Sequence, residues 1–213
     1  MCTAASFKGF FGRNLDFDFS YGQEIVITPR NYSFSFKHEE TIDKHPAIIG
    51  AGIIQEGYPL YFDAINEHGL GMAGLNFVGN CVYRDVDDTK INIAQFDLIP
   101  YVLSKCKTLD EAKELFKNIN LSKDSINDKY PPTQMHWYVS DGYKSIVVES
   151  VKDGVKVYDD PVNVLTNNPP FELQMFNLNN YQHLSSADPV NNFEGVELTK
   201  YSRGMGGLGL PGD

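Results

Sequence analysis

Short apolar runs that alternate with polar residues dominate the first 80 positions and predict a series of strands. Lys8 and Gly9 separate the first two runs and are typical of a tight hairpin turn. Positions 47–54 are apolar almost throughout, which predicts a strand buried on both faces. The predicted strands are 2–7, 10–14, 24–28, 47–54, 60–66 and 69–77.

Helical spacing of apolar residues replaces this pattern in the middle of the chain. Positions 91–105 are predicted to form one helix. Thr108 and Glu111 form a capping box that opens a second helix, whose apolar face is predicted to include Phe116 and Ile119. Positions 121–132 are mostly polar and are interpreted as a loop.

Strand patterns then return, and one more helix is predicted before the end. The strands are 135–139, 145–149, 155–158 and 162–166, and a helix over 171–183 follows Pro169 and Pro170. Positions 186–213 are interpreted as loop. Strands, then helices, then strands predict an α+β fold with antiparallel sheets covered by helices, in a single domain spanning 1–213.

Charge and composition exclude some classes of function. The net charge is −10, from 18 basic and 28 acidic residues, and argues against nucleic-acid binding, which depends on clustered Lys and Arg. The sequence has neither a membrane-spanning apolar run nor a signal-peptide pattern, so a cytoplasmic protein without a membrane partner is expected. The 14 Phe and 12 Tyr favour a rich core, with a pocket for a bulky apolar ligand as the alternative.

Three cysteines, without paired spacing, argue against a disulfide framework and against a Cys-x-x-Cys metal site. Cys2 becomes the first residue if Met1 is removed. It then carries a thiol of pKa about 8.5 beside an α-amine of pKa about 8, so one residue supplies both a nucleophile and a base. The alternatives are a structural cysteine and a Cys–His dyad with one of the five histidines.

Two charged residues follow the predicted hairpin turn and would return to the neighbourhood of Cys2. Arg13 would favour the thiolate form of the cysteine, and Asp16 would orient the α-amine. A surface ion pair is the alternative interpretation. Farther along, the acidic cluster at 85–88 is interpreted as a solvated loop rather than a calcium site, because the EF-hand pattern is missing.

The ordered set of motifs resembles the choloylglycine hydrolase family, which comprises bile salt hydrolases and penicillin V acylases. The matching segments run in family order along the whole chain: 1–3, 11–16, 28–31, 66–77, 136–137, 145–149, 164–169, 177–181 and 206–213. The resemblance implies an N-terminal nucleophile hydrolase fold, a four-layer αββα sandwich. It also implies hydrolysis of a linear amide without a metal or organic cofactor.

The resemblance also assigns roles to individual residues. Cys2 matches the nucleophile, Arg13 the arginine beside the thiol, and Asp16 the carboxylate at the amine. Asn76 and Asn167 match the two asparagines near the oxyanion site; without the resemblance, both would be interpreted as ordinary turn or strand-end residues. Asparagine at 76 favours a bile salt over penicillin V as the substrate.

The resemblance leads to two further expectations. The stretch from Cys2 to Arg13 is shorter than is typical, so the hairpin turn is expected to be trimmed. The family continues for about a third of its length beyond position 213, with a further catalytic arginine, so the chain is expected to be C-terminally truncated. The predicted substrate is a glycine- or taurine-conjugated bile salt and the predicted assembly a homo-oligomer, by resemblance a tetramer. Penicillin V acylase and an inactive remnant that binds an amphipathic ligand are the alternatives.

Overall fold

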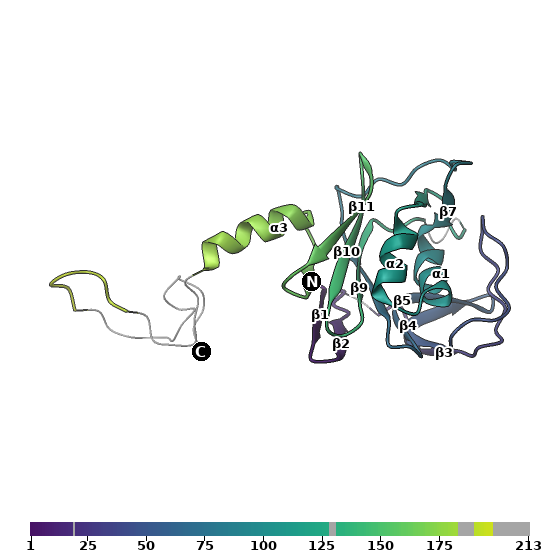
Figure 1. Ribbon diagram of the computed structural model, residues 1–213, viewed down its shortest axis with the longest axis horizontal. Coiled ribbons are helices and arrows are strands. Elements are labelled where there is room, and N and C mark those ends of the chain that lie inside the picture. The colour runs from purple at the N-terminus through teal and green to yellow at the C-terminus, as the bar shows by residue number, and fades with distance from the viewer. Residues whose placement is uncertain (19, 128–130, 183–189, 198–213) are drawn as a thin grey trace. The chain divides into compact units, whose positions relative to one another are not determined.

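The computed structural model describes residues 1–18, 20–127, 131–182 and 190–197. The chain forms two compact units, Met1–Phe171 and Glu172–Asp213, which are described separately. The single domain over 1–213 stays a prediction. Within its described residues, the first unit is built of two antiparallel sheets, one parallel strand pair and two helices (Figure 1).

A small antiparallel sheet has the strand order β12-β1-β2. It consists of β1 (Thr3–Phe7), β2 (Phe10–Asn14) and β12 (Val164–Thr166). Lys8 and Gly9 connect β1 and β2 with φ of 49° and 85°. Positive φ at both turn residues is typical of the two-residue hairpin, so the prediction of a tight turn is confirmed.

A large antiparallel sheet of seven strands has the order β11-β10-β9-β6-β5-β4-β3. All seven strands were predicted, with bounds that differ by a few residues. They are β3 (Glu24–Thr28), β4 (Ile48–Gln55), β5 (Tyr58–Asn66), β6 (Gly71–Asn76), β9 (Met135–Ser140), β10 (Ser145–Val151) and β11 (Gly154–Asp160).

The strand β4 corrects the prediction that positions 47–54 are buried on both faces. Ile49 and Ile54 keep 44% and 50% of their surface exposed, whereas Ile48 and Ile53 are buried. Composition alone gave the wrong prediction for β4, because an apolar run does not show whether a second layer covers the other face of the strand.

The segment 91–105 is only partly helical, which corrects a second prediction. It begins as β7 (Ile91–Ala94), passes through a short 3-10 turn at Gln95–Asp97, and becomes helical at α1 (Leu98–Lys105). Strand β7 pairs in parallel with β8 (Ile119–Ser122), where a loop and the end of a helix were predicted. Tertiary pairing between distant segments overrides the local helical spacing.

The capping box was predicted correctly. The Thr108 side chain accepts a hydrogen bond from the Glu111 backbone N–H. The Glu111 carboxylate in turn accepts a hydrogen bond from the Thr108 backbone N–H. The box opens α2 (Leu109–Phe116), whose buried face includes Ala112 and Phe116. Ile119 lies in β8 and not on this helix.

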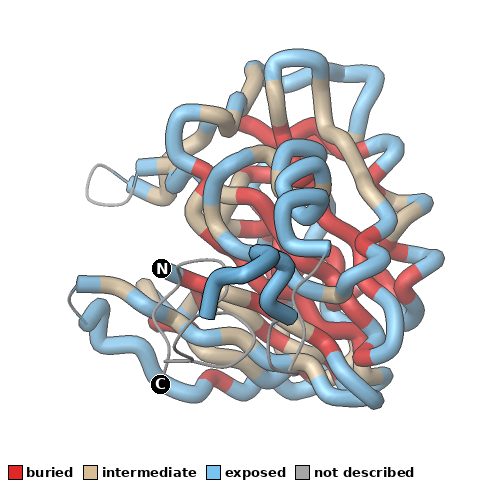
Figure 2. Tube along the Cα trace, turned by 90° about the vertical axis from the view of Figure 1, so that its left-hand side faces the viewer, coloured by how far each residue is buried: buried red, intermediate tan, exposed pale blue. Residues whose placement is uncertain are grey.

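Strand β6 separates two layers of the core, since successive side chains point to opposite faces. Leu70 and Met72 belong to the apolar cluster that includes α1 and α2. Gly71 faces the small sheet, where a Cβ atom would lie 2.8 Å from the Phe11 ring. The first unit is therefore layered as helices, large sheet and small sheet, and buried positions run along the central strands (Figure 2).

The second unit contains most of α3 (Phe171–Asn177), whose first residue belongs to the first unit, followed by a 3-10 turn at Leu178–Tyr181. The prediction of a helix after Pro169 and Pro170 is confirmed as far as 177. His183, the predicted end, lies outside the described residues, as does most of the predicted loop 186–213.

Gly71 provides a stability prediction for the contact between the sheets. Gly71→Ala is expected to lower the free energy of unfolding by about 1–3 kcal/mol, because the added methyl group would force the Phe11 ring to move. Gly12→Ala is the matched control on β2, where a Cβ atom would meet nothing within 4 Å. Urea unfolding, followed by the fluorescence of the sole tryptophan, Trp137, measures both. Equal stability of the two variants would contradict the tight contact.

Candidate active site

Cys2 lies directly before β1 and is 1% exposed. In the small sheet Thr3 pairs with Thr166, so continuing this register by one residue brings Cys2 opposite Asn167. Ala4 is buried and pairs with Arg13 on one side and with Leu165 on the other. Residues opposite each other in a sheet share a face. Register therefore predicts that Cys2, Arg13 and Asn167 share the inner face of the small sheet.

Asp16 contacts the amino terminus of Met1, and the predicted contact with a Cys2 α-amine stays a prediction. Its Oδ2 lies 2.5 Å from the Met1 amino nitrogen. The hydrogen bond to Asp16, together with its charge, raises the pKa of this amine. The Asp16 carbonyl oxygen lies 4.0 Å from the Cys2 Sγ. One residue thus contacts both the terminus and the thiol.

Asn14 is a residue to which the sequence interpretation gave no role. Its Oδ1 accepts a hydrogen bond of 2.6 Å from the Thr3 backbone N–H, and its Nδ2 donates to the Met1 carbonyl at 3.2 Å. The amide therefore holds the backbone on both sides of Cys2. An Asn at the end of a hairpin strand was the only signal, and it is a common one for ordinary structural reasons.

Arg13 is held between the two sheets, and its guanidinium side chain is 4% exposed. Its Nη1 donates to Asp63 Oδ2 at 3.1 Å, and its Nη2 donates to the Gly74 carbonyl at 2.9 Å. Burial raises the pKa of Asp63, and the Arg13 charge opposes that rise. The guanidinium thus links β2 to β5 and β6, at a register position two residues along from Cys2.

The segments that contain Asn76 and Asn167 are tied together by hydrogen bonds. Asn168 Nδ2 donates to the Val78 carbonyl at 2.9 Å, and Asn80 Nδ2 donates to Asn168 Oδ1 at 3.0 Å. Register supports Asn167 as a neighbour of Cys2. It does not do so for Asn76, because alternation along β6 puts that side chain on the Met72 face.

A buried His–Glu pair lies behind these segments. His136 and Glu149 are directly opposite on β9 and β10, both fully buried. His136 Nδ1 lies 3.1 Å from Glu149 Oε1, and its Nε2 lies 2.9 Å from the Thr166 carbonyl oxygen. Both ring nitrogens are thus engaged away from the Cys2 thiol. From the sequence, residue 136 was part of a family motif and one of five histidines considered for a Cys–His dyad, and its pairing with Glu149 was not predicted.

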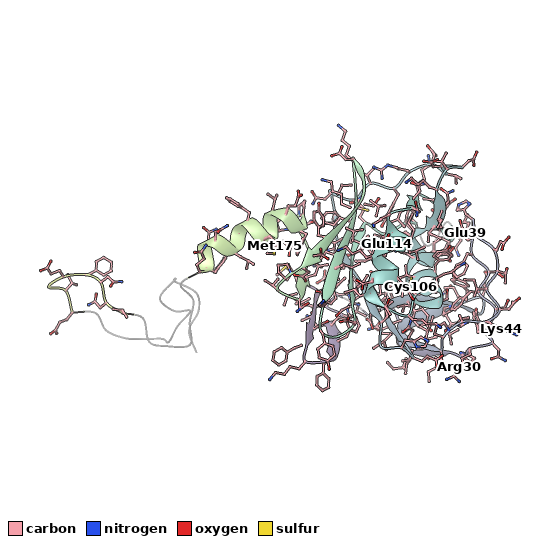
Figure 3. The ribbon with its side chains drawn as sticks, in the orientation of Figure 1. Arg30, Glu39, Lys44, Cys106, Glu114 and Met175 are labelled. Carbon is pink, nitrogen blue, oxygen red and sulfur yellow. The ribbon has the colours of Figure 1, made fainter. Side chains whose placement is uncertain are left out.

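The other two cysteines have thiols that burial keeps protonated. Burial raises the pKa of Cys106 to about 12 and also raises that of Cys81. Cys106 follows the end of α1 and Glu114 lies on α2 (Figure 3), and both line an open depression of about 490 Å³ on the helical side of the large sheet. This depression lies on the opposite face of the large sheet from Cys2.

The acidic cluster 85–88 is an exposed loop, as interpreted from the sequence. Asp87 Oδ1 accepts hydrogen bonds from the Thr89 backbone N–H and hydroxyl, and these contacts lower the pKa of Asp87. Asp85 pairs with Lys123 at 2.6 Å. Among the residues that the structure describes, no group of three or more His, Cys, Asp or Glu side chains could hold a metal ion.

Comparisons with known proteins match the whole chain to one family. Residues 1–213 match the family described as linear amide C–N hydrolases, choloylglycine hydrolase family. The chain is 50% identical over 217 residues to a bile salt hydrolase/transferase of Lactiplantibacillus plantarum, covering 100% of this chain and 67% of the relative. None of the described helices is long and apolar enough to cross a bilayer.

Solved structures agree as well. The C2A variant of conjugated bile acid hydrolase from Clostridium perfringens superposes with a TM-score of 0.90 at 36% identity, covering 100% of this chain and 68% of the other. A penicillin V acylase from Agrobacterium tumefaciens matches with a TM-score of 0.68 at 20% identity, over 87% of this chain and 60% of the other. The second likeness concerns the fold alone.

The layered sheets and these matches define the class as an amide C–N hydrolase with the N-terminal nucleophile hydrolase fold, which confirms the expected α+β architecture. The chain belongs to the choloylglycine hydrolase family. It spans about two thirds of the length of the relatives that it matches.

Proposed function

We propose that this chain hydrolyses the amide bond of glycine- or taurine-conjugated bile salts, with Cys2 as the nucleophile. The observation that supports it most is the register that brings Cys2 opposite Asn167, beside an Asp16 carboxylate that binds the α-amine of the chain. Relatives that cover the whole chain are named as hydrolases of bile salts or conjugated bile acids.

The proposed reaction begins once Met1 has been removed. The Cys2 α-amine takes the thiol proton, and the thiolate attacks the amide carbonyl carbon to form a tetrahedral oxyanion. The C–N bond then breaks, the α-ammonium protonates the departing amine, and a thioester remains. Water, deprotonated by the same amine, attacks the thioester and releases the free bile acid and the thiol.

Four further residues are proposed to assist Cys2. Asp16 would orient the Cys2 α-amine after Met1 is removed; with Met1 in place, Asp16 contacts the Met1 amine. Arg13 adds a buried positive charge on the inner face, which favours a thiolate. Asn167 would donate its amide N–H to the oxyanion. Asn76 is proposed as a second donor on the family resemblance alone, because alternation along β6 puts its side chain on the Met72 face. Such donors are worth about 3–4 kcal/mol in the transition state.

A labelling experiment tests whether the terminus matures as this mechanism requires. Intact mass is expected to show loss of Met1, and iodoacetamide near pH 7 is expected to label Cys2 while Cys106 stays unlabelled because of its raised pKa. Peptide mapping locates the label. Retention of Met1, or a label on Cys106 before Cys2, would argue against the proposed nucleophile.

Substrate class is tested by measuring the release of one hydrolysis product from each substrate. Glycine release from glycocholate is expected to exceed phenoxyacetate release from penicillin V in the same preparation. The reverse order would favour an acylase. We also propose a homo-oligomer, which light scattering measures. A cytoplasmic location is proposed as well, and cell fractionation tests it.

A further inference from the structure

The buried His136–Glu149 pair touches the backbone neighbours of both candidate oxyanion donors. The His136 imidazole donates from Nε2 to the Thr166 carbonyl, the residue directly before Asn167. Its face stacks on Phe77, the residue directly after Asn76, with ring centroids 4.5 Å apart and planes within 6°. A single side chain thus contacts both segments that would form the oxyanion site.

Glu149 extends this contact to the next element. Its Oε1 accepts a hydrogen bond of 2.9 Å from the backbone N–H of Phe171, four residues after Asn167. The same oxygen receives the contact from His136 Nδ1. Among the described residues, Oε2 of Glu149 has no hydrogen-bond partner, so one oxygen accounts for both contacts. The stretch from Thr166 to Phe171 is therefore held at both of its ends.

The hydrogen bonds of His136 and Glu149 are coupled by the number of protons that the two side chains carry. Donation from Nε2 to the Thr166 carbonyl requires a proton on Nε2, so the contact between Nδ1 and Oε1 needs one more proton, placed on either atom. Both side chains are fully buried, and a bare nitrogen facing a carboxylate oxygen there would be strongly unfavourable. The hydrogen bonds of His136 to Thr166 and to Glu149 can therefore form together only when that additional proton is present, whereas Phe171 donates its own N–H to Glu149.

We propose that His136 and Glu149 are positioning residues that hold the Asn167 segment, and through Phe77 the Asn76 segment, in place for oxyanion stabilisation. This inference rests on the proposed function for its kinetic consequence. Its structural consequence, a fixed 164–171 segment, stands independently. Both side chains are fully buried, so we expect them to act through the segments that contain the asparagines and not on the substrate itself.

Glu149→Gln is the sharpest test, because it preserves side-chain volume and removes the shared proton. If the amide oxygen faces His136, the ring must move its proton to Nδ1 and lose the Thr166 contact. If the amide nitrogen faces His136, Phe171 loses its acceptor. In either arrangement one of the three hydrogen bonds is lost.

The expected kinetic result is a fall in kcat of roughly tenfold to a hundredfold on glycocholate, with KM changed less than about threefold, since misplacing a transition-state donor has this effect. The iodoacetamide rate at Cys2 is expected to stay the same, because alkylation forms no oxyanion. In an Asn167→Ala background, Glu149→Gln is expected to lower kcat by less than about threefold. Full additivity in this cycle would overturn the proposal.

Asp97→Asn is the matched control, because Asp97 is also a buried carboxylate, and it accepts hydrogen bonds from the Lys37 backbone N–H and the Tyr58 hydroxyl near α1. It is expected to lower the unfolding midpoint without the selective loss of kcat. A fall in kcat that merely follows the stability loss in both variants would indicate an ordinary structural pair. Should Glu149→Gln fail to fold, Phe77→Leu removes the ring stacking alone and is expected to show the same pattern, more weakly.

Amide hydrogen exchange separates this inference from the function on which it rests. Peptides covering 164–171 are expected to exchange faster in Glu149→Gln than in the unsubstituted protein, whereas peptides of α1 and α2 keep their rates. Unchanged exchange at 164–171 overturns the positioning role whatever the activity. No glycine release from the unsubstituted protein overturns the proposed function instead, and the exchange result still decides the positioning role.

Discussion

Cys2→Ala is expected to reduce glycine release from glycocholate by at least about 10⁴-fold, while the protein remains folded. Removal of a covalent nucleophile typically has an effect of this size, because only binding and oxyanion contacts remain. Alanine preserves the α-amine, so the loss would be attributed to sulfur rather than to the base. Glycine assays measure activity, and Trp137 fluorescence reports the fold.

Cys106→Ala is the control for this prediction. Cys106 is equally buried but lies at the end of α1, on the other face of the large sheet from Cys2. Its substitution is expected to leave kcat within about threefold, since a distant core change affects mainly stability. Substantial activity in Cys2→Ala, or an equal loss in Cys106→Ala, would rule out Cys2 as the nucleophile.

Local signals made most of the fold predictable. The hairpin at Lys8 and Gly9 and the capping box at Thr108 are formed by residues close in sequence, so the local sequence is sufficient to predict them. Strand β7 was missed because Ile91 pairs with Ile119, 28 positions away, and local spacing favours a helix. Exposure of Ile49 was missed for a similar reason, since it depends on which layer lies above β4.

The candidate site divides in the same way. Cys2, Arg13 and Asp16 lie on one hairpin, so their proximity follows from local sequence, and the structure places Asp16 at the terminus. The partners of Arg13 could not be predicted, because Asp63 and Gly74 come from other strands. Asn167 comes opposite Cys2 only through the pairing of β1 with β12, a contact across almost the whole first unit.

Arg13→Met is expected to lower the free energy of unfolding by about 3–5 kcal/mol. Methionine replaces the aliphatic part of the side chain but leaves the Asp63 carboxylate buried without its positive partner, which is costly. The Gly74 carbonyl also loses its donor. Urea unfolding at pH 7 measures the loss, and Arg13→Met combined with Asp63→Asn is expected to recover part of it.

The stability loss in Arg13→Met is expected to depend on pH in a definite direction. Burial raises the pKa of Asp63 even with Arg13 present, and removal of the guanidinium raises it further. A folded-state pKa above the unfolded value makes the folded state bind the proton more tightly, so stability is highest below the ordinary Asp range and falls as pH rises through the folded pKa. The deficit relative to the unsubstituted protein is thus expected to shrink as the pH falls toward about 4.

Arg30→Met is the matched control, because Arg30 also pairs with a carboxylate, that of Glu67, but at the surface (Figure 3). Solvent screens an exposed pair, so a much smaller change in the unfolding midpoint is expected. If both variants lose the same stability, the Arg13–Asp63 pair is no more than an ordinary surface pair. If Arg13→Met instead keeps its stability but loses kcat, Arg13 acts on the Cys2 thiolate rather than through its link between the sheets.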